Sequence, residues 1–253
     1  MPVPREKARR WKIVEIACRL GSEVKKIGRK FTLRICLLRP GKPSLMPIQP
    51  CPRSMPDSYL FDIGNVIINV DFTLAAGKIS SHAIVAPEEM TTLVAPLMVD
   101  LELGRIGPDA FIEAASATIG YSGDPEYFRT SFADIFELNS PMVSFIEALK
   151  ARGKPLYLLS NTNVIHVQFF EAAFPVFGLF DGAIYSHEVG LMKPDPAIFE
   201  IVKSTLPIDP SRTVYIDDLT ANCEAGRAAG FLAVPYAAAR HDEFLKTISG
   251  IEE

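Results

Sequence analysis

The chain has 253 residues, of which 48% are hydrophobic, and its formal net charge is −4. This length allows one sizeable buried core and a smaller inserted unit. Residues 1–54 hold 14 Lys and Arg against three Glu, whereas the remaining residues hold 12 Lys and Arg against 27 Asp and Glu. The acidic remainder argues against a nucleic-acid-binding surface there, and no apolar run is long enough to span a membrane.

Residues 1–54 combine a basic amphipathic pattern with a proline-rich end. Between Arg9 and Leu20, apolar residues recur at helical spacing beside basic ones, and five prolines between residues 40 and 52 predict a linker. We predict a flexible or non-native extension, with Met55 as the true start of the protein. An organelle transit peptide is the alternative, although such peptides are rich in serine and this segment is not.

The cysteines form no CxxC pair, and three of the four lie in the first 54 residues. This pattern favours free thiols in a reducing cytoplasm over a disulfide framework or a zinc site. We therefore predict a cytoplasmic protein. The four residues are Cys18, Cys36, Cys51 and Cys223.

From Tyr59 onward, short apolar runs alternate with helical patterns, which is typical of a parallel sheet covered by helices on both faces. Each run is short and apolar throughout, as expected for a strand that is buried on both sides. The sequence thus predicts a Rossmann-like α/β fold. The candidate strands are Tyr59–Asp62, Leu156–Ser160, Ala183–Ser186, Val214–Asp217 and Leu232–Pro235.

The residues between the first two candidate strands read as helices only. Proline, usually beside an acid or a capping residue, stands at four expected helix starts in this region. Phe128, Phe132, Ile135 and Phe136 then recur at helical spacing and predict one apolar helix face. We predict a helical cap over 73–140, inserted into a core formed by 55–72 and 141–253.

Three of the candidate strands end in polar groups, namely Asp62, Ser160-Asn161 and Asp217-Asp218. Because ligands in parallel sheets bind at the carboxyl ends of the strands, we expect these groups to converge. Asp62 and Asp218 can share Mg²⁺, a hard ion that takes oxygen ligands. Asp62 can then attack a phosphate ester, while Ser160 and the amide of Asn161 bind the phosphoryl oxygens.

Lys193 lies in a loop bounded by two prolines, Pro194 and Pro196, which hold it at a fixed place. Its positive charge can offset the negative charge that accumulates in the transition state of phosphoryl transfer. A lone Lys-Pro pair is common, so this assignment depends on the neighbouring motifs.

Together these motifs resemble those of the haloacid dehalogenase superfamily of hydrolases, from about Tyr59 to Tyr236. The matching segments are 61–66, 158–161, 193–194 and 215–222, in the order typical of that family. The resemblance implies a small-molecule phosphate ester as substrate and Mg²⁺ as cofactor, with Asp217 and Asn222 orienting the other groups. It implies Asp62, Lys193 and Asp217 as catalytic residues, Ser160, Asn161, Lys193 and Asn222 as substrate-binding residues, and Asp62, Gly64 and Asp218 as metal ligands.

Gly64 departs from the family pattern. In most phosphatases that this chain resembles, the second residue after the nucleophile is another aspartate, which protonates the leaving oxygen. Loss of a general acid typically lowers the rate by a factor on the order of 10²–10⁴. The sequence therefore allows a modified phosphatase, a metal-independent 2-haloacid dehalogenase or a non-catalytic binding protein.

The doubled carboxylate Asp217-Asp218 favours the metal-dependent phosphatase over the metal-free dehalogenase. The motif set also resembles the branch typified by α-D-glucose-1-phosphate phosphatase, which implies a sugar phosphate. An anomeric phosphate leaves as a stabilised oxyanion, so it needs less help from an acid. The base that activates water is not identified; Asp71 is near in sequence, but the sequence does not give its direction.

The four histidines show no metal-ligand spacing. We interpret them as surface or core residues, and His187 is expected to lie nearest to the site because it shortly precedes Lys193. Cys223, in the helix that follows the last motif, is expected to be a buried thiol.

Overall fold

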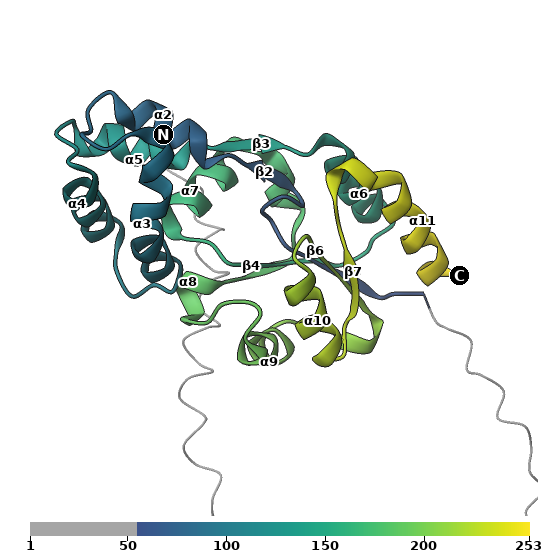
Figure 1. The fold of residues 1–253 in the computed structure, drawn as a ribbon. Helices are drawn as coiled ribbons and strands as arrows, with labels where there is room; N and C mark the ends of the chain where they lie inside the picture. The colour runs from purple at the N-terminus through teal and green to yellow at the C-terminus, as the bar shows by residue number, and fades with distance from the viewer. Residues whose placement is uncertain (1–54) are drawn as a thin grey trace, which may run out of the picture. The chain divides into compact units, whose positions relative to one another are not determined.

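The computed structural model describes residues 55–253, and the helix and linker predicted within 1–54 lie outside the described residues. Five strands form one sheet, in the spatial order β5-β4-β1-β6-β7, and every neighbouring pair is parallel. β1 occupies the centre of the sheet (Figure 1). The strands are β1 (Ser58–Phe61), β4 (Leu156–Ser160), β5 (Gly182–Tyr185), β6 (Thr213–Asp217) and β7 (Leu232–Pro235).

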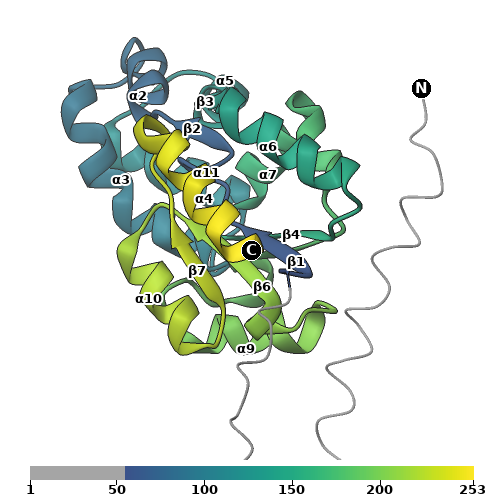
Figure 2. The same ribbon diagram turned by 90° about the vertical axis from the view of Figure 1, so that its right-hand side faces the viewer.

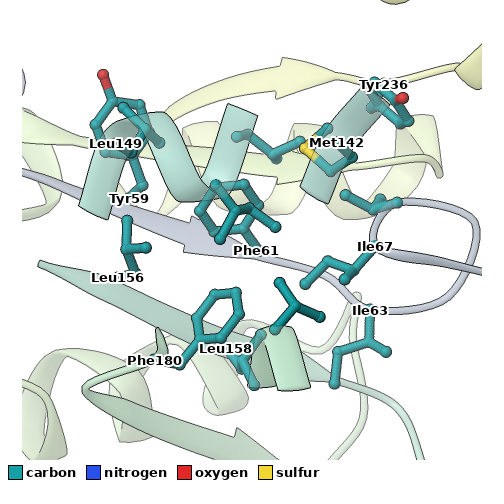
Figure 3. Packing of buried hydrophobic residues seen from close by; sticks show 14 of the residues in the cluster. Tyr59, Phe61, Ile63, Ile67, Met142, Leu149, Leu156, Leu158, Phe180 and Tyr236 are labelled. Carbon is teal, nitrogen blue, oxygen red and sulfur yellow. The ribbon is translucent and has the colours of Figure 1, made fainter. Parts of the chain in front are cut away.

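Alternate residues of the central strand face opposite sides of the sheet. Tyr59 and Phe61 belong to one buried apolar cluster, part of which is drawn in Figure 3, whereas Leu60 belongs to another. In β4, Leu158 and Leu159 divide between the two clusters in the same way. The continuous apolar runs in the sequence therefore arise because both faces are covered by helices.

Helices α6, α7 and α11 cover the first face, and α9 and α10 cover the second (Figures 1 and 2). The predicted α/β fold, with helices on both faces, is confirmed. A short helix, α8 (Ser186–Val189), follows β5 directly. The covering helices are α6 (Ser140–Ala151), α7 (Val164–Ala173), α9 (Pro196–Thr205), α10 (Thr220–Ala228) and α11 (His241–Glu252).

Four helices between β1 and β4 enclose a separate apolar cluster and form the cap. Proline stands in the first turn of α3, α4 and α5, as the sequence indicates. Ile165 of α7 also belongs to this cluster, so the cap packs on the core. The helices are α2 (Phe72–Ser80), α3 (Pro87–Glu102), α4 (Pro108–Ile119) and α5 (Pro125–Ala133).

The expectation of helices alone in this region is wrong, because two short strands frame the cap. β2 (Ile68–Val70) pairs antiparallel with β3 (Phe136–Leu138), and Val70 lies opposite Phe136. α5 ends at Ala133, so Ile135 and Phe136 do not continue its apolar face. The strand pairing satisfies the backbone of Phe136 where helical hydrogen bonds end.

Within residues 55–253, no helix is both long and apolar enough to cross a membrane. Cys223 is a free thiol and is buried, as expected. Its Sγ lies 3.5 Å from the carbonyl oxygen of Asp217, at the end of β6.

Candidate active site

The carboxyl ends of β1, β4 and β6 meet at one edge of the sheet, because these three strands are neighbours and parallel. Asp62 follows β1 directly and is only 7% exposed. Its backbone N–H donates to the carbonyl of Ile216 at 2.8 Å, and its Oδ1 accepts from the N–H of Ile63 at 2.7 Å. The carboxylate of Asp62 is thus held in a fixed direction at the centre of this edge.

Lys193 joins the two buried carboxylates of the site. Its Nζ lies 2.8 Å from Asp62 Oδ1 and 2.7 Å from Asp217 Oδ2, and it also donates to the carbonyl of Leu159 at 3.0 Å. Lys193 as a whole residue is only 4% exposed. A buried lysine is stable as a cation only when it is paired, and here three acceptors surround it.

These contacts control the charge states of the three groups. Burial lowers the pKa of Lys193, but the charges of Asp62 and Asp217 outweigh this effect and raise it above its usual value. Burial raises the pKa of Asp62 to about 6 in spite of the opposing charge of Lys193. Burial also raises the pKa of Asp217, but the charge of Lys193 and the hydrogen bonds to the carboxylate outweigh this effect and lower the pKa below its usual value.

Asp217 is fully buried, and both of its carboxylate oxygens are saturated with donors. Oδ1 accepts from Leu219 N–H and from Asn222 Nδ2, each at 2.9 Å. Oδ2 accepts from Lys193 Nζ at 2.7 Å and from the hydroxyl of Tyr215 at 2.6 Å. With all four lone-pair positions used, this carboxylate positions Lys193 and has no free oxygen for a metal ion.

Asn222 is 2% exposed, and its Nδ2 donates a hydrogen bond to Asp217. The resemblance groups Asn222 with the substrate-binding residues. Tyr215 was not singled out in the sequence, although the two-residue period of a strand places it on the same side of β6 as Asp217. The alternation of residues along β6 could therefore have identified Tyr215 as a neighbour of Asp217.

Asp218 is half-buried, and burial raises its pKa. Asn65 Nδ2 donates to Asp218 Oδ2 at 3.3 Å. Oxygen atoms of Asp62, Asp217 and Asp218 all lie within 4.8 Å of one another. Three carboxylates against one lysine leave an excess of negative charge, and hard carboxylate oxygens suit Mg²⁺, so the residues fit a divalent cation.

The turn after Asp62 depends on Asn65 and not on Gly64. Asn65 has φ 54, in the left-handed region that asparagine tolerates, whereas Gly64 does not adopt a positive φ. A Cβ atom added to Gly64 would lie 3.4 Å from Val70 Cγ2, an ordinary contact distance. The left-handed position of this turn therefore belongs to Asn65, and the fold leaves room for a Cβ atom at Gly64.

The phosphate-binding candidates lie at the end of β4. Ser160 is buried, and its hydroxyl forms no hydrogen bond within the described part of the chain. The side chain of Asn161 bonds to both backbone polar groups of Lys193, at 2.8 and 2.9 Å. Asn161 thus connects β4 to the loop that carries Lys193.

Asp71 and the histidines have structural contacts. Asp71 Oδ1 accepts from Thr73 N–H at 2.9 Å and so caps α2. The side chain of Asp71 thus points toward the start of α2, and it has no hydrogen bond with the other site residues. His166 is buried between α7 and the cap. His187 Nδ1 lies 3.1 Å from the carbonyl oxygen of Thr162, two residues after Ser160.

Comparison with known proteins places these features in a family. The sequence model described as haloacid dehalogenase-like hydrolase matches residues 57–230. The D-ribitol-5-phosphate phosphatase of Bacteroides thetaiotaomicron is 24% identical over 183 residues, which cover 69% of this chain and 88% of that protein. The phosphoglycolate phosphatase of Haemophilus influenzae is 26% identical over 108 residues, covering 43% of this chain and 48% of that protein.

Solved structures agree with this placement. A HAD family enzyme from Bacteroides thetaiotaomicron, in complex with magnesium and inorganic phosphate, superimposes with a TM-score of 0.66 at 26% identity. The match covers 73% of this chain and 96% of that chain. A dehalogenase structure reaches a TM-score of 0.54 at 17% identity, which shows a shared fold alone.

Proposed function

Because the chain belongs to the haloacid dehalogenase-like hydrolases, we propose that it is a Mg²⁺-dependent phosphatase of a small sugar or polyol phosphate. One observation carries the proposal: Asp62, at the end of the central strand, lies within 4.8 Å of Asp217 and Asp218 and contacts Lys193. The D-ribitol-5-phosphate phosphatase among its relatives supports a polyol or sugar ester as the substrate class.

In the proposed reaction, Asp62 attacks phosphorus and forms an aspartyl-phosphate, and the P–O bond to the alcohol breaks. Lys193 offsets the charge that develops on the phosphoryl group, while Asp217 and Asn161 keep Lys193 in position. The hydroxyl of Ser160 donates to a phosphoryl oxygen. Water then attacks the same phosphorus atom, releases inorganic phosphate and restores Asp62.

Asp62, Asp218 and the carbonyl of Gly64 are the residues that would hold Mg²⁺. When bound, the ion polarises a phosphoryl oxygen and offsets the charge of the carboxylates. The four hydrogen bonds that the carboxylate of Asp217 accepts support its assignment to the positioning of Lys193, outside the ligand set.

Gly64 offers no side chain to protonate the leaving oxygen. A sugar 1-phosphate releases a hemiacetal oxyanion, which is a better leaving group than a simple alkoxide, so we propose that a 1-phosphate is cleaved much faster than the 6-phosphate of the same sugar. Equal rates on the two esters would contradict this part of the proposal.

The deciding experiment measures phosphate release from a panel of sugar and polyol phosphates, with Mg²⁺ and with EDTA. The Asp62→Asn variant is the control. Release that requires both Mg²⁺ and Asp62 supports the phosphatase. Chloride release from a 2-haloacid without metal would favour the dehalogenase, and phosphate binding without any turnover would favour a binding protein.

A further inference from the structure

The loop between β4 and α7 (residues 160–163) has its own contacts with the core. The side chain of Asn161 bonds to the backbone of Lys193 at 2.8 and 2.9 Å. Ser186 Oγ bonds to both backbone groups of Thr162, at 2.9 and 3.0 Å. The loop that carries the proposed phosphate ligands is therefore held on the core without the cap.

The last residue of this loop, Asn163, is bonded to a histidine in the first turn of α7. Asn163 is 1% exposed and His166 is 4% exposed, so both are buried. Asn163 Oδ1 accepts from the backbone N–H of His166 at 3.1 Å and so caps α7. Asn163 Nδ2 lies 3.0 Å from His166 Nδ1, and this contact fixes the direction of the imidazole ring.

The other nitrogen of the ring reaches the cap. His166 Nε2 lies 3.1 Å from the carbonyl oxygen of Phe132, the last but one residue of α5. The last four carbonyls of a helix have no donor within the helix, and His166 supplies one of them with a donor. The ring is also packed against Phe132 and Phe136, with centroids 4.5 and 5.0 Å away, and Phe72 lies at 6.2 Å.

These three phenylalanines mark the places where the cap joins the core. Phe72 is the first residue of α2, and Phe136 is the first residue of β3, which follows α5. One side chain of the core thus contacts the segment that enters the cap and both segments that leave it.

The contacts define where the imidazole carries its hydrogen. A carbonyl oxygen can only accept, so Nε2 carries a hydrogen and donates it to Phe132. Burial lowers the pKa of His166 to about 4, so the ring is neutral and its Nδ1 carries no hydrogen. Nδ1 therefore accepts from Asn163 Nδ2, and every polar atom of the pair has a partner.

We propose that His166 is a positioning residue for the proposed phosphatase reaction, and that its Nε2–H holds the end of α5, and with it the cap, at a fixed distance from the β4–α7 loop. The inference rests on the proposed function and concerns a residue outside the four family motifs. A leaving group large enough to reach the cap depends on this distance, whereas a small leaving group does not.

Two substitutions in the full-length protein separate the hydrogen bond from the imidazole ring. Glutamine has as many bonds between Cα and its amide nitrogen as histidine has between Cα and Nε2, so His166→Gln can donate to the carbonyl of Phe132. The side chain of asparagine is one bond shorter, so His166→Asn loses that hydrogen bond. His82→Asn, at an exposed position between α2 and α3, is the matched control for the loss of an imidazole.

Steady-state kinetics with Mg²⁺ compare D-ribitol 5-phosphate, which has a large leaving group, with acetyl phosphate, which has a small one. We expect His166→Asn to raise KM for ribitol 5-phosphate about three- to tenfold, because one lost hydrogen bond reduces the population of correctly placed caps. The kcat values and the KM for acetyl phosphate stay at the parent level, since Asp62 and Lys193 keep their contacts. His166→Gln and His82→Asn behave as the parent on both esters.

An unchanged KM for ribitol 5-phosphate in His166→Asn overturns the inference. So does an equal rise in His166→Gln, which would show that the ring and not the hydrogen bond matters. An equal loss on both esters would mean that His166 supports the structure in general and does not place the cap.

Two further measurements do not depend on turnover. Nitrogen NMR of the unmodified protein at neutral pH should show a neutral His166 ring with its hydrogen on Nε2, and a hydrogen on Nδ1 or a cationic ring overturns the inference whether or not the variants fold. Amide hydrogen exchange in residues 125–138 should be faster in His166→Asn than in His166→Gln. Equal exchange in the two variants contradicts the link to α5.

These measurements separate the inference from the proposed function. If neither ester releases phosphate but the NMR and exchange results are as expected, the phosphatase is wrong and the role of His166 in placing the cap stands. If phosphate is released and the hydrogen lies on Nδ1, the phosphatase stands and the assignment of His166 is wrong.

Discussion

The side chain of Asn161 forms two hydrogen bonds with the backbone of Lys193. Its Nδ2 donates to the carbonyl of Lys193 at 2.9 Å, and its Oδ1 accepts from the N–H of Lys193 at 2.8 Å. Asn161 follows β4, so a rigid strand determines where the lysine loop lies. The ammonium group is therefore already positioned to bridge Asp62 and Asp217.

Removal of this pair of hydrogen bonds should release the lysine loop. We expect Asn161→Ala to lower the free energy of unfolding by about 1–3 kcal/mol, since each of two hydrogen bonds contributes about 1 kcal/mol. We also expect kcat to fall on the order of 10- to 100-fold through misplacement of Lys193. Urea unfolding and phosphate-release kinetics measure both effects.

The control is Asn69→Ala, at an exposed position of β2 with no hydrogen bond from its side chain within the described residues. It should leave stability and kcat within error of the parent protein. Full activity in Asn161→Ala would show that the lysine loop holds its position without Asn161.

Gly64→Asp should supply the general acid that the chain lacks. The backbone at this position is not left-handed, and the nearest atom to an added Cβ lies at 3.4 Å, so the Cβ atom of the new residue fits. The neighbouring carboxylates raise the pKa of the new acid and keep it protonated. We expect kcat on simple alkyl phosphates to rise by a factor of up to about 10².

Gly64→Ala adds the same Cβ atom without the acid and is the matched control for this gain. It should leave kcat on alkyl phosphates unchanged. An equal gain in Gly64→Ala and Gly64→Asp would mean that restriction of the backbone, and not proton donation, limits the reaction.

Gly104→Ala should force the turn after α3 away from α8, because its Cβ atom would lie 2.2 Å from the carbonyl oxygen of His187. We expect a higher KM for the phosphate ester and a loss of stability beyond the strain of a left-handed residue. Gly153→Ala is the control, since Gly153 has a similar φ of +72 with no atom within 4 Å of the added Cβ.

The strain alone should cost about 1–2 kcal/mol in either variant. Thermal unfolding and steady-state kinetics on both proteins measure the difference. If the two variants lose the same stability and keep the same KM, the close approach of Gly104 to His187 has no role in holding the cap over the site.

His166 makes the fold sensitive to acid. Its ring is buried against Phe132 and Phe136, and its Nε2 lies 3.1 Å from the carbonyl oxygen of Phe132. Burial lowers the pKa of His166 to about 4 in the folded protein, below its ordinary value of 6.5. Between these values the unfolded chain binds more protons, so the free energy of unfolding falls as pH decreases from about 6.5 to 4.

The full loss amounts to about 3 kcal/mol over that interval. His166→Gln keeps a polar side chain that does not titrate, so its stability should depend less steeply on pH. The measurement is urea unfolding of both proteins from pH 4.5 to 7.5. Identical pH slopes in the two proteins would mean that His166 is not the group responsible.

The sheet and the ends of its strands could be predicted from the sequence alone. Each buried strand is a short apolar run, and the run stops where a polar residue such as Asp62 or Ser160 appears. Because parallel strands share one carboxyl edge, local patterns were sufficient to predict that these residues converge. Proline at the helix starts marked the cap helices for the same local reason.

Tertiary structure decided what depends on distant partners. β2 and β3 have three residues each and exist because they pair with one another, so no local period reveals them. Asp217 and Asp218 are identical residues in adjacent positions, yet one meets Lys193 and Tyr215 while the other faces Asn65. Their roles differ because successive side chains of a strand end point in opposite directions.

The same limit applies to Gly64. Gly64 and Asn65 are both residue types that suit a turn, and only the folded backbone shows that the left-handed position belongs to Asn65. The sequence by itself determined which groups end the strands, and the packing of remote segments decided which of those groups are free to bind.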